Sequence, residues 1–252
     1  MKQAAEHRLA ELCSQFRLPT IGAELHQRLD RAGYLDALAT VIEVFEMEAE
    51  DRRQRRVQRL LTSSKLPAGK TFELFEQTRL PSALRKQIDQ LATGDFLANA
   101  TNVLCFGLPG TGKSHVAAAI GHSLVQRGHS VLFTPTFELV QHLLAAKRDL
   151  ELPRSLRKLD NFELIVLDDI GYVKQSAEEI EVLFTLLAER YERRSLLITS
   201  NLVFNEWDQI FKNPMTTAAA IDRLVHHSVI LEFSVQSYRT DTAKKRQTKS
   251  RS

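Results

Sequence analysis

The sequence has few cysteines and no long apolar segment, and each shortage excludes a class of protein. Only two cysteines occur in 252 residues, Cys13 and Cys105, and neither lies in a CxxC or Cys/His pattern. This argues against a disulfide framework and a thiolate zinc site, and it fits a reducing cytoplasm. No apolar run approaches the ~20 residues of a membrane-spanning helix, and the N-terminus lacks a signal-peptide core. We therefore expect a cytoplasmic protein with no membrane association.

Histidines are also not arranged in a metal-binding pattern. The adjacent pair His226-His227 precedes a strand-like run near the C-terminal end. No carboxylate or cysteine lies at ligand spacing from this pair in the sequence, so the pattern argues against a zinc site.

Charge of one sign is concentrated only at the C-terminal end. The formal net charge is +3, but residues 239–252 alone carry six basic groups and one acidic group. Such a basic tail can contact phosphate backbones, although most basic termini are simply solvated. Both interpretations stay open.

Glycine is scarce, with 10 residues in the chain, yet three glycines fall within one octet. The octet reads Gly107, Leu108, Pro109, Gly110, Thr111, Gly112, Lys113, Ser114; an apolar run precedes it and a helix-like segment follows. Glycines let backbone N–H groups turn inward as an anion-binding nest, beside the positive end of the new helix. Lys113 would reach the β- and γ-phosphates, and Ser114 would bind Mg²⁺. The octet therefore predicts a phosphate-binding loop (P-loop).

Apolar periodicity divides the chain into parts. Residues 1–65 show helical spacing and predict a small all-α N-terminal domain with a core along its apolar stripes. The stripes are Leu9, Leu12, Cys13, Phe16, Ile21, Leu25, Leu29, Leu35, Leu38, Ile42 and Phe45. A connector is expected over residues 66–98 and an ATPase domain over 99–238. The basic tail follows at 239–252, which leaves no room for a substantial C-terminal lid domain.

Strand-like and helix-like runs alternate from residue 99 onward and predict an α/β fold, a P-loop core with a five-stranded parallel sheet flanked by helices. The run Ser130–Thr134 intervenes between the P-loop strand and the run Leu164–Leu167. If the intervening strand lies at the sheet edge, Leu196–Ser200 can sit between the other two. This order is typical of additional-strand ATPases rather than of kinases or GTPases.

Polar residues end two of the predicted strands. Asp168 lies at the carboxyl end of a buried parallel strand, beside the nucleotide crevice, where it can hold Mg²⁺ directly or through water. Asp169 points differently and either orients the water that attacks the γ-phosphate or merely caps the next turn. Asn201 projects an amide toward the γ-phosphate or the lytic water, unless Ser200-Asn201 is an ordinary turn.

One helix of the N-terminal domain contains five arginines in eight residues. Four of them, Arg52, Arg55, Arg56 and Arg59, fall at i, i+3, i+4 and i+7 and would present one face to a nucleic-acid backbone. Alternatively, Glu48 and Asp51 pair with the arginines four residues later on a solvated helix. The sequence leaves the two interpretations even.

The motifs together resemble a known family. The chain is similar to AAA+ ATPases of the helicase-loader and transposition-helper branch, and above all to the IstB-type helpers of bacterial insertion sequences. The residues that carry the resemblance are Gly107–Ser114, Leu164–Asp169, Thr199–Asn201, Ile221–Leu224 and Ser237–Arg239, with further likeness at Leu18–Thr20 and Tyr34-Leu35.

The resemblance implies roles for two more residues. Arg223 corresponds to an arginine finger that reaches the γ-phosphate of a neighbouring subunit, or else it is a surface ion-pair residue. Arg239 corresponds to a second sensor that contacts the nucleotide of its own subunit. Many AAA+ proteins have Glu where this chain has Asp169, so hydrolysis is expected to be slow.

The resemblance also implies a function. ATP and Mg²⁺ would drive a homo-oligomer to assemble on double-stranded DNA, recruit and stimulate a cognate transposase, and hydrolysis would dissolve the assembly. Such a protein is bacterial and joins the nucleoid when bound to DNA. The nearest alternative is a replicative helicase loader of the DnaC type. A small-molecule P-loop kinase and an ATP-binding adaptor without turnover are more distant alternatives.

Overall fold

The chain forms two compact units, residues 1–59 and 60–252, in a computed structural model. The structure describes residues 2–171, 176–211, 213–235 and 237–238. Within those ranges, no helix combines the length and apolarity needed to cross a membrane.

The N-terminal unit is helical, as predicted. Its helices are α1 (Lys2–Phe16), α2 (Pro19–Arg31) and α3 (Ala37–Ser64), the last of which continues beyond residue 59. Leu9, Cys13 and Leu38 are buried, and Leu25 and Phe45 pack partly buried against them. The apolar stripes predicted from the sequence therefore do meet in a small core.

Ile21, which belongs to the predicted stripes, lies outside this core. Ile21 keeps 38% of its surface exposed, and α2 has no fully buried residue. A unit of this size buries a smaller fraction of its surface than a large domain does. Its outer helix is therefore only half covered.

The second unit is an α/β domain whose parallel sheet has the strand order β2-β3-β4-β1-β5. Its strands are β1 (Asn102–Gly107), β2 (Val131–Pro135), β3 (Leu164–Ile170), β4 (Ser195–Ser200) and β5 (Ser228–Phe233). The predicted order is confirmed, because β2 lies at the edge and β4 lies between β1 and β3.

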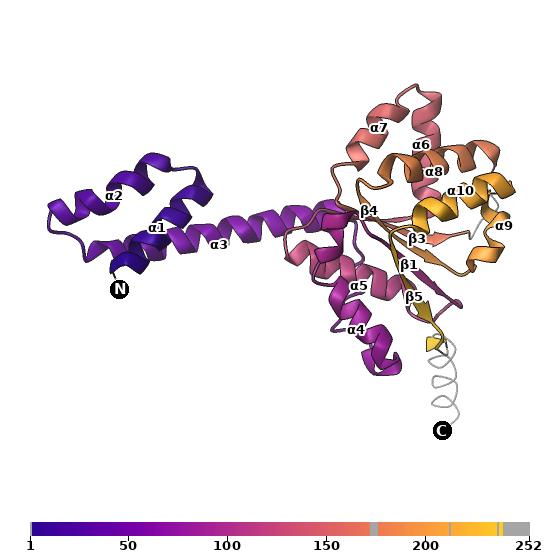
Figure 1. Ribbon diagram of the computed structural model, residues 1–252, viewed down its shortest axis with the longest axis horizontal. Coiled ribbons are helices and arrows are strands. Elements are labelled where there is room, and N and C mark those ends of the chain that lie inside the picture. The colour runs from indigo at the N-terminus through magenta and orange to yellow at the C-terminus, as the bar shows by residue number, and fades with distance from the viewer. Residues whose placement is uncertain (1, 172–175, 212, 236, 239–252) are drawn as a thin grey trace. The chain divides into compact units, whose positions relative to one another are not determined.

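Helices cover both faces of the sheet (Figure 1). One face carries α4 (Ser82–Leu91) and α5 (Lys113–Gln126), and the other carries α6 (Thr136–Arg148), α8 (Ala177–Arg190) and α10 (Pro214–Val225), with α7 (Leu152–Leu159) and α9 (Asp208–Phe211) nearby. Three 3-10 turns span Gln77–Arg79, Asp95–Asn99 and Phe204–Glu206. Because both faces are covered, each central strand contains a buried apolar run, namely Val103–Phe106, Leu164–Leu167 and Leu196–Ile198.

A buried arginine fixes the amino ends of two central strands. Arg190, at the end of α8, is 1% exposed. Its guanidinium donates to the carbonyl oxygens of Leu159 (3.1 Å), Phe162 (2.9 Å) and Ser195 (3.0 Å). Burial lowers its pKa to about 10, so the group stays charged at neutral pH. The segment before β3 and the start of β4 are thereby tied to one side chain.

Candidate nucleotide-binding site

The P-loop backbone depends on glycine at two closely packed positions. Gly107 has φ +152° and Gly112 has φ +102°. A Cβ at Gly107 would lie 2.6 Å from the carbonyl oxygen of Phe233, and one at Gly112 would lie 2.9 Å from the Phe75 ring. Any other residue would displace β5 or the Phe75 ring, and would strain the loop.

Lys113 lies at the centre of the loop and is 6% exposed. Its ammonium group donates to the carbonyl oxygens of Gly107 (2.7 Å) and Leu108 (2.9 Å) and to Oδ1 of Asn201 (2.7 Å). It also follows Gly112, the N-cap of α5, so the charge lies at the positive end of a helix. The arrangement concentrates positive potential where a phosphate would bind.

The two aspartates sit at an irregularity in the β3–β4 pairing. The register shifts between Leu167 and Ile170, and Asp169 has a left-handed φ of +62°. Thr199 of β4 joins the pair, because its Oγ1 donates to Oδ1 of Asp168 (2.7 Å) and accepts from the backbone N–H of Asp169 (2.8 Å). A bulge of this kind redirects side chains at the end of a strand.

Asn201 connects this carboxylate pair to the P-loop. Its Nδ2 donates to Oδ1 of Asp169 (2.9 Å), while its Oδ1 accepts from Lys113. Lys113, Asn201 and Asp169 therefore form one continuous chain of side-chain hydrogen bonds. The sequence placed these residues near one another, but it gave no sign of the two direct bonds.

The chain of hydrogen bonds borders a cleft of about 300 Å³. Its lining comprises Lys70, Pro109, Gly110, Gly112, Lys113, Ser114, His115, Asp169, Thr199, Asn201 and Tyr238. Asp168 is not part of the lining and lies behind Thr199 through their hydrogen bond. The hydroxyl of Ser114 and the carboxylates of Asp168 and Asp169 are the oxygen donors that Mg²⁺ prefers.

A second hollow of about 170 Å³ adjoins the cleft. His115 and Tyr238 line both spaces, and Leu74, Phe75 and Val235 give the second one an apolar wall. The remaining lining residues are Glu76, Arg79, Leu80 and Thr111. Apolar and aromatic side chains of this kind suit the flat face of a nucleobase.

The connector before β1 is held against the P-loop and α5 by polar contacts. His115 Nε2 lies 2.8 Å from the carbonyl oxygen of Thr71, and the Phe75 and His115 ring centroids are 4.9 Å apart. On the other side of the loop, the backbone N–H of Tyr238 donates to the carbonyl oxygen of Gly110 (2.9 Å). The sequence gave no sign that Lys70, His115, Thr199 and Tyr238 line the cleft, although Thr199 and Tyr238 lie in segments that carry the family resemblance.

Arg223 is not among the residues that line the cleft. It lies on α10, where its guanidinium stacks over the Phe184 ring at 4.7 Å. No ion pair joins it to Asp222 within the described ranges, and its buried Nη1 makes no hydrogen bond there. Arg239 and the basic tail lie outside the described residues.

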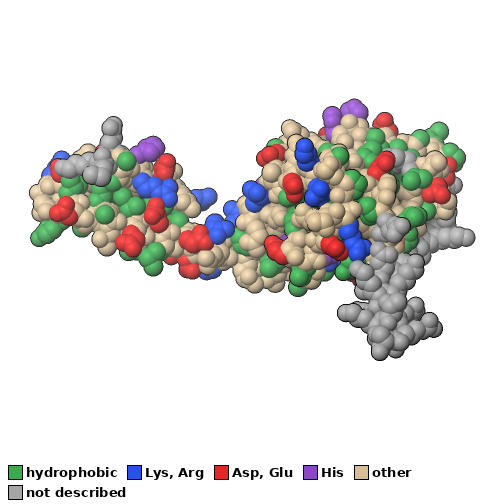
Figure 2. All heavy atoms as spheres, turned by 90° about the horizontal axis from the view of Figure 1, so that it is seen from below, with side chains coloured by type: hydrophobic (Ala, Val, Ile, Leu, Met, Phe, Trp, Pro, Cys, Tyr) green, Lys and Arg blue, Asp and Glu red, His purple; other side chains and the backbone are tan. Residues whose placement is uncertain are grey.

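The arginine stripe of the N-terminal unit is paired in part. Arg52 donates to Glu48 (2.6 Å) and Arg55 to Asp51 (2.7 Å), and both pairs are exposed. These are the i,i+4 pairs of the alternative interpretation. Acidic and basic side chains accordingly lie side by side on this unit (Figure 2). Arg59 bonds only weakly, with Nε 3.4 Å from the carbonyl oxygen of Arg55.

The cysteines contribute no chemistry to the site. Cys105 is fully buried in β1, and this burial raises its pKa to about 12. Burial also raises the pKa of Cys13, in the N-terminal unit. Both thiols therefore remain protonated and unreactive at neutral pH.

The site combines a P-loop after β1, two aspartates near the end of β3, and a polar residue directly after β4, the strand between β1 and β3. These features define a P-loop nucleotide-binding protein of the AAA+ class. Comparison with known proteins agrees. The family described as "IstB-like ATP binding protein" matches residues 5–247, and the chain belongs to this family.

Two curated relatives come from bacterial insertion sequences. A putative insertion sequence ATP-binding protein of Sinorhizobium fredii is 45% identical over 94% of this chain and 81% of its own length. The insertion sequence IS21 putative ATP-binding protein of Pseudomonas aeruginosa is 34% identical over 95% and 91%.

Solved structures share the fold at low sequence identity. The DnaC helicase loader matches with a TM-score of 0.58 and 17% identity, over 66% of this chain and 98% of its own. DnaI matches with a TM-score of 0.56 and 20% identity, over 68% and 96%. The chain therefore shares the fold of these two structures.

Proposed function

We propose that this protein is a DNA-dependent ATPase that assists transposition. The observation that carries the proposal is the chain of hydrogen bonds from Lys113 through Asn201 to Asp169, beside the P-loop. It joins a phosphate-binding cation, a polar sensor and a carboxylate base in one cleft. A protein that only held a nucleotide would not need the carboxylate base.

Different residues of the cleft have different roles in the proposed ATP hydrolysis. The P-loop amides and Lys113 bind the phosphates, with Lys113 exchanging its carbonyl partners for phosphate oxygens. Ser114 would hold Mg²⁺ directly and Asp168, which lies behind Thr199, would hold it through water, and the ion would offset charge on the phosphates. Asp169 accepts a proton from the attacking water, and Asn201 holds that carboxylate in position.

The second hollow is the proposed site of the adenine base. Phe75 and Leu74 offer apolar contact on the connector side, and Tyr238 closes the other side. Because His115 and Tyr238 line both spaces, a nucleotide with its phosphates on the P-loop can place its base there. Arg239, the next residue in the sequence, is proposed to contact the same nucleotide.

DNA binding is proposed for the N-terminal unit. The helix face Arg52, Arg55, Arg56 and Arg59 supports it, although Arg52 and Arg55 must give up their acidic partners to contact phosphate. The salt dependence of duplex binding tests this assignment, since each lost phosphate contact lowers the slope of log K against log salt by ~0.9. If the double variant Arg55→Ala/Arg59→Ala has the same salt dependence as the wild type, these arginines do not contact DNA.

Assembly completes the proposal. Subunits bind side by side on double-stranded DNA, each presents Arg223 to the γ-phosphate of the next, and the homo-oligomer recruits a cognate transposase. ATP hydrolysis then releases the assembly. The relatives' insertion-sequence origin supports a transposase partner over a replicative helicase. A stable complex with a replicative helicase would favour the loader function instead.

The variant Asp169→Asn separates hydrolysis from nucleotide binding. It keeps the hydrogen-bonding shape of the side chain but removes the base. We expect phosphate release with duplex DNA to fall by at least about 10²-fold, with unchanged ATP affinity. Steady-state phosphate release and binding of a fluorescent ATP analogue measure the two quantities. Equal turnover in the wild type and Asp169→Asn would contradict the role of Asp169.

A further inference from the structure

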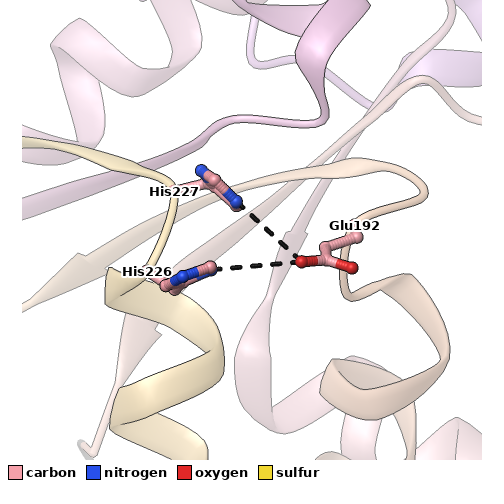
Figure 3. Close-up of side chains that lie close together, drawn as sticks. All are labelled: Glu192, His226 and His227. Carbon is pink, nitrogen blue, oxygen red and sulfur yellow. Dashed lines mark ion pairs between the residues drawn. The ribbon is translucent and has the colours of Figure 1, made fainter.

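Three exposed residues that are distant from the P-loop in the sequence lie close together in the structure. Glu192 lies in the turn between α8 and β4, and His226 and His227 lie between α10 and β5. Oε1 of Glu192 is 4.0 Å from Nδ1 of His226 and 3.9 Å from Nε2 of His227. Both imidazoles face the same carboxylate oxygen (Figure 3). The sequence separates Glu192 from the histidines, so local spacing gave no sign of this cluster.

The sheet topology explains the convergence. Glu192 precedes β4 and His227 precedes β5, and β1 lies between these two strands. The backbone N–H of Asn102, which begins β1, donates to the carbonyl oxygen of His227 (2.7 Å), and Oδ1 of Asn102 accepts from the backbone N–H of Leu196 in β4 (2.9 Å). The cluster therefore lies at the amino edge of the parallel sheet. The P-loop lies at the carboxyl edge, so the two sites are separate.

The distances suit a shared cation better than hydrogen bonds. Separations of 3.9 and 4.0 Å exceed hydrogen-bond length, and all three ligand atoms lie within 4.8 Å of one another. Ligands at ~2.0–2.1 Å in a tetrahedral zinc site are themselves about 3.4 Å apart. Small rotations of exposed side chains close this gap. The imidazole rings are inclined by 65°, so their nitrogens can approach one point from different directions.

We propose that Glu192, His226 and His227 form a surface site for a divalent transition-metal cation, with Zn²⁺ as the representative ion. Two imidazoles and one carboxylate are the donors that such cations prefer, and water completes the coordination. The cation displaces the hydroxyl of Tyr191, which lies 3.2 Å from Nδ1 of His226. Once bound, it ties the turn after α8 to the end of α10.

Cobalt provides a direct test on the full-length protein without an affinity tag. Co²⁺ is titrated at neutral pH in the absence of nucleotide, and d–d absorption bands report nitrogen coordination; competition with Zn²⁺ then gives the zinc affinity. We expect one site for each chain. His226→Ala, His227→Ala and Glu192→Gln should each weaken binding by at least about tenfold, since even an outer-shell change commonly costs that much.

A matched control excludes general histidine binding. His7 is exposed and has a single carboxylate partner, Glu11, at 3.4 Å. His7→Ala should therefore keep wild-type affinity. The two buried cysteines add no competing thiolates. Zn²⁺ should also raise the melting temperature of the wild type and the control but not of the three cluster variants. Equal Co²⁺ spectra in all proteins, or no band in the wild type, would overturn the proposal.

Discussion

At the scale of single residues, Asn201 is the connection on which the site depends. Its amide bonds both Lys113 and Asp169 and so links the P-loop to the end of β3. The P-loop itself could be predicted from the sequence, because its function resides in eight consecutive residues. The places of Lys70 and Tyr238 in the lining could not be predicted, because these residues reach the cleft from segments before and after the sheet.

Removing the Asn201 amide should impair turnover more than binding. In Asn201→Ala, Asp169 loses its hydrogen-bond donor, and we expect kcat to fall by about 10²-fold with little change in ATP affinity. Asn205→Ala is the matched control, since Asn205 is exposed and lies outside the cleft lining. Phosphate release and ATP-analogue binding decide the matter. A fall in affinity alone would make Asn201 a binding residue and not a sensor.

At the scale of elements, strand order was predictable and the bulge in β3 was not. The intervening run Ser130–Thr134 indicated an edge strand, and β2 is at the edge. The register shift after Leu167 results from tertiary contacts, above all the bonds of Thr199 to Asp168 and Asp169. Apolar periodicity reports which residues are buried, but it says nothing of such local side-chain bonds. The position of Glu192 beside His226 escaped prediction for the same reason.

Substitution of Arg190 tests how much the stability of the domain depends on the buried side chain that ties the starts of β3 and β4 together. Arg190→Met keeps much of the volume but leaves the carbonyl oxygens of Leu159, Phe162 and Ser195 without this donor. We expect the free energy of unfolding to fall by about 3 kcal/mol. Urea denaturation measures it, with the exposed Arg154→Met as control. If Arg190→Met lowers the free energy of unfolding by less than the control does, the hydrogen bonds of Arg190 are dispensable for stability.

At the scale of the whole molecule, the proposed role of Arg223 as an arginine finger would set the geometry of assembly. Arg223 is absent from the cleft of its own chain, as a residue that acts on a neighbour would be. The Arg223 guanidinium stacks over the Phe184 ring, and its Nη1 is buried. An active site completed in trans makes hydrolysis depend on contact between subunits, and hence on DNA.

Mixing two inactive variants tests action in trans. Lys113→Ala removes phosphate binding but keeps the finger, and Arg223→Ala keeps phosphate binding but lacks the finger. Each alone should lose at least about 10²-fold in DNA-stimulated phosphate release. An equal mixture should recover part of the activity, because an Arg223→Ala subunit can receive the finger of a Lys113→Ala neighbour. If the mixture stays as inactive as its components, Arg223 does not act between subunits.

The claim that the P-loop controls assembly on DNA is tested most directly by measuring ATP-dependent assembly on duplex DNA. Sedimentation of the wild type and Lys113→Ala, each with Mg²⁺, duplex DNA, and ATP or a non-hydrolysable analogue, measures it. We expect a large wild-type complex that persists with the analogue, dissolves as ATP is consumed, and does not form with Lys113→Ala. Equal assembly of both proteins, or assembly without nucleotide, would contradict the claim that the P-loop controls assembly on DNA.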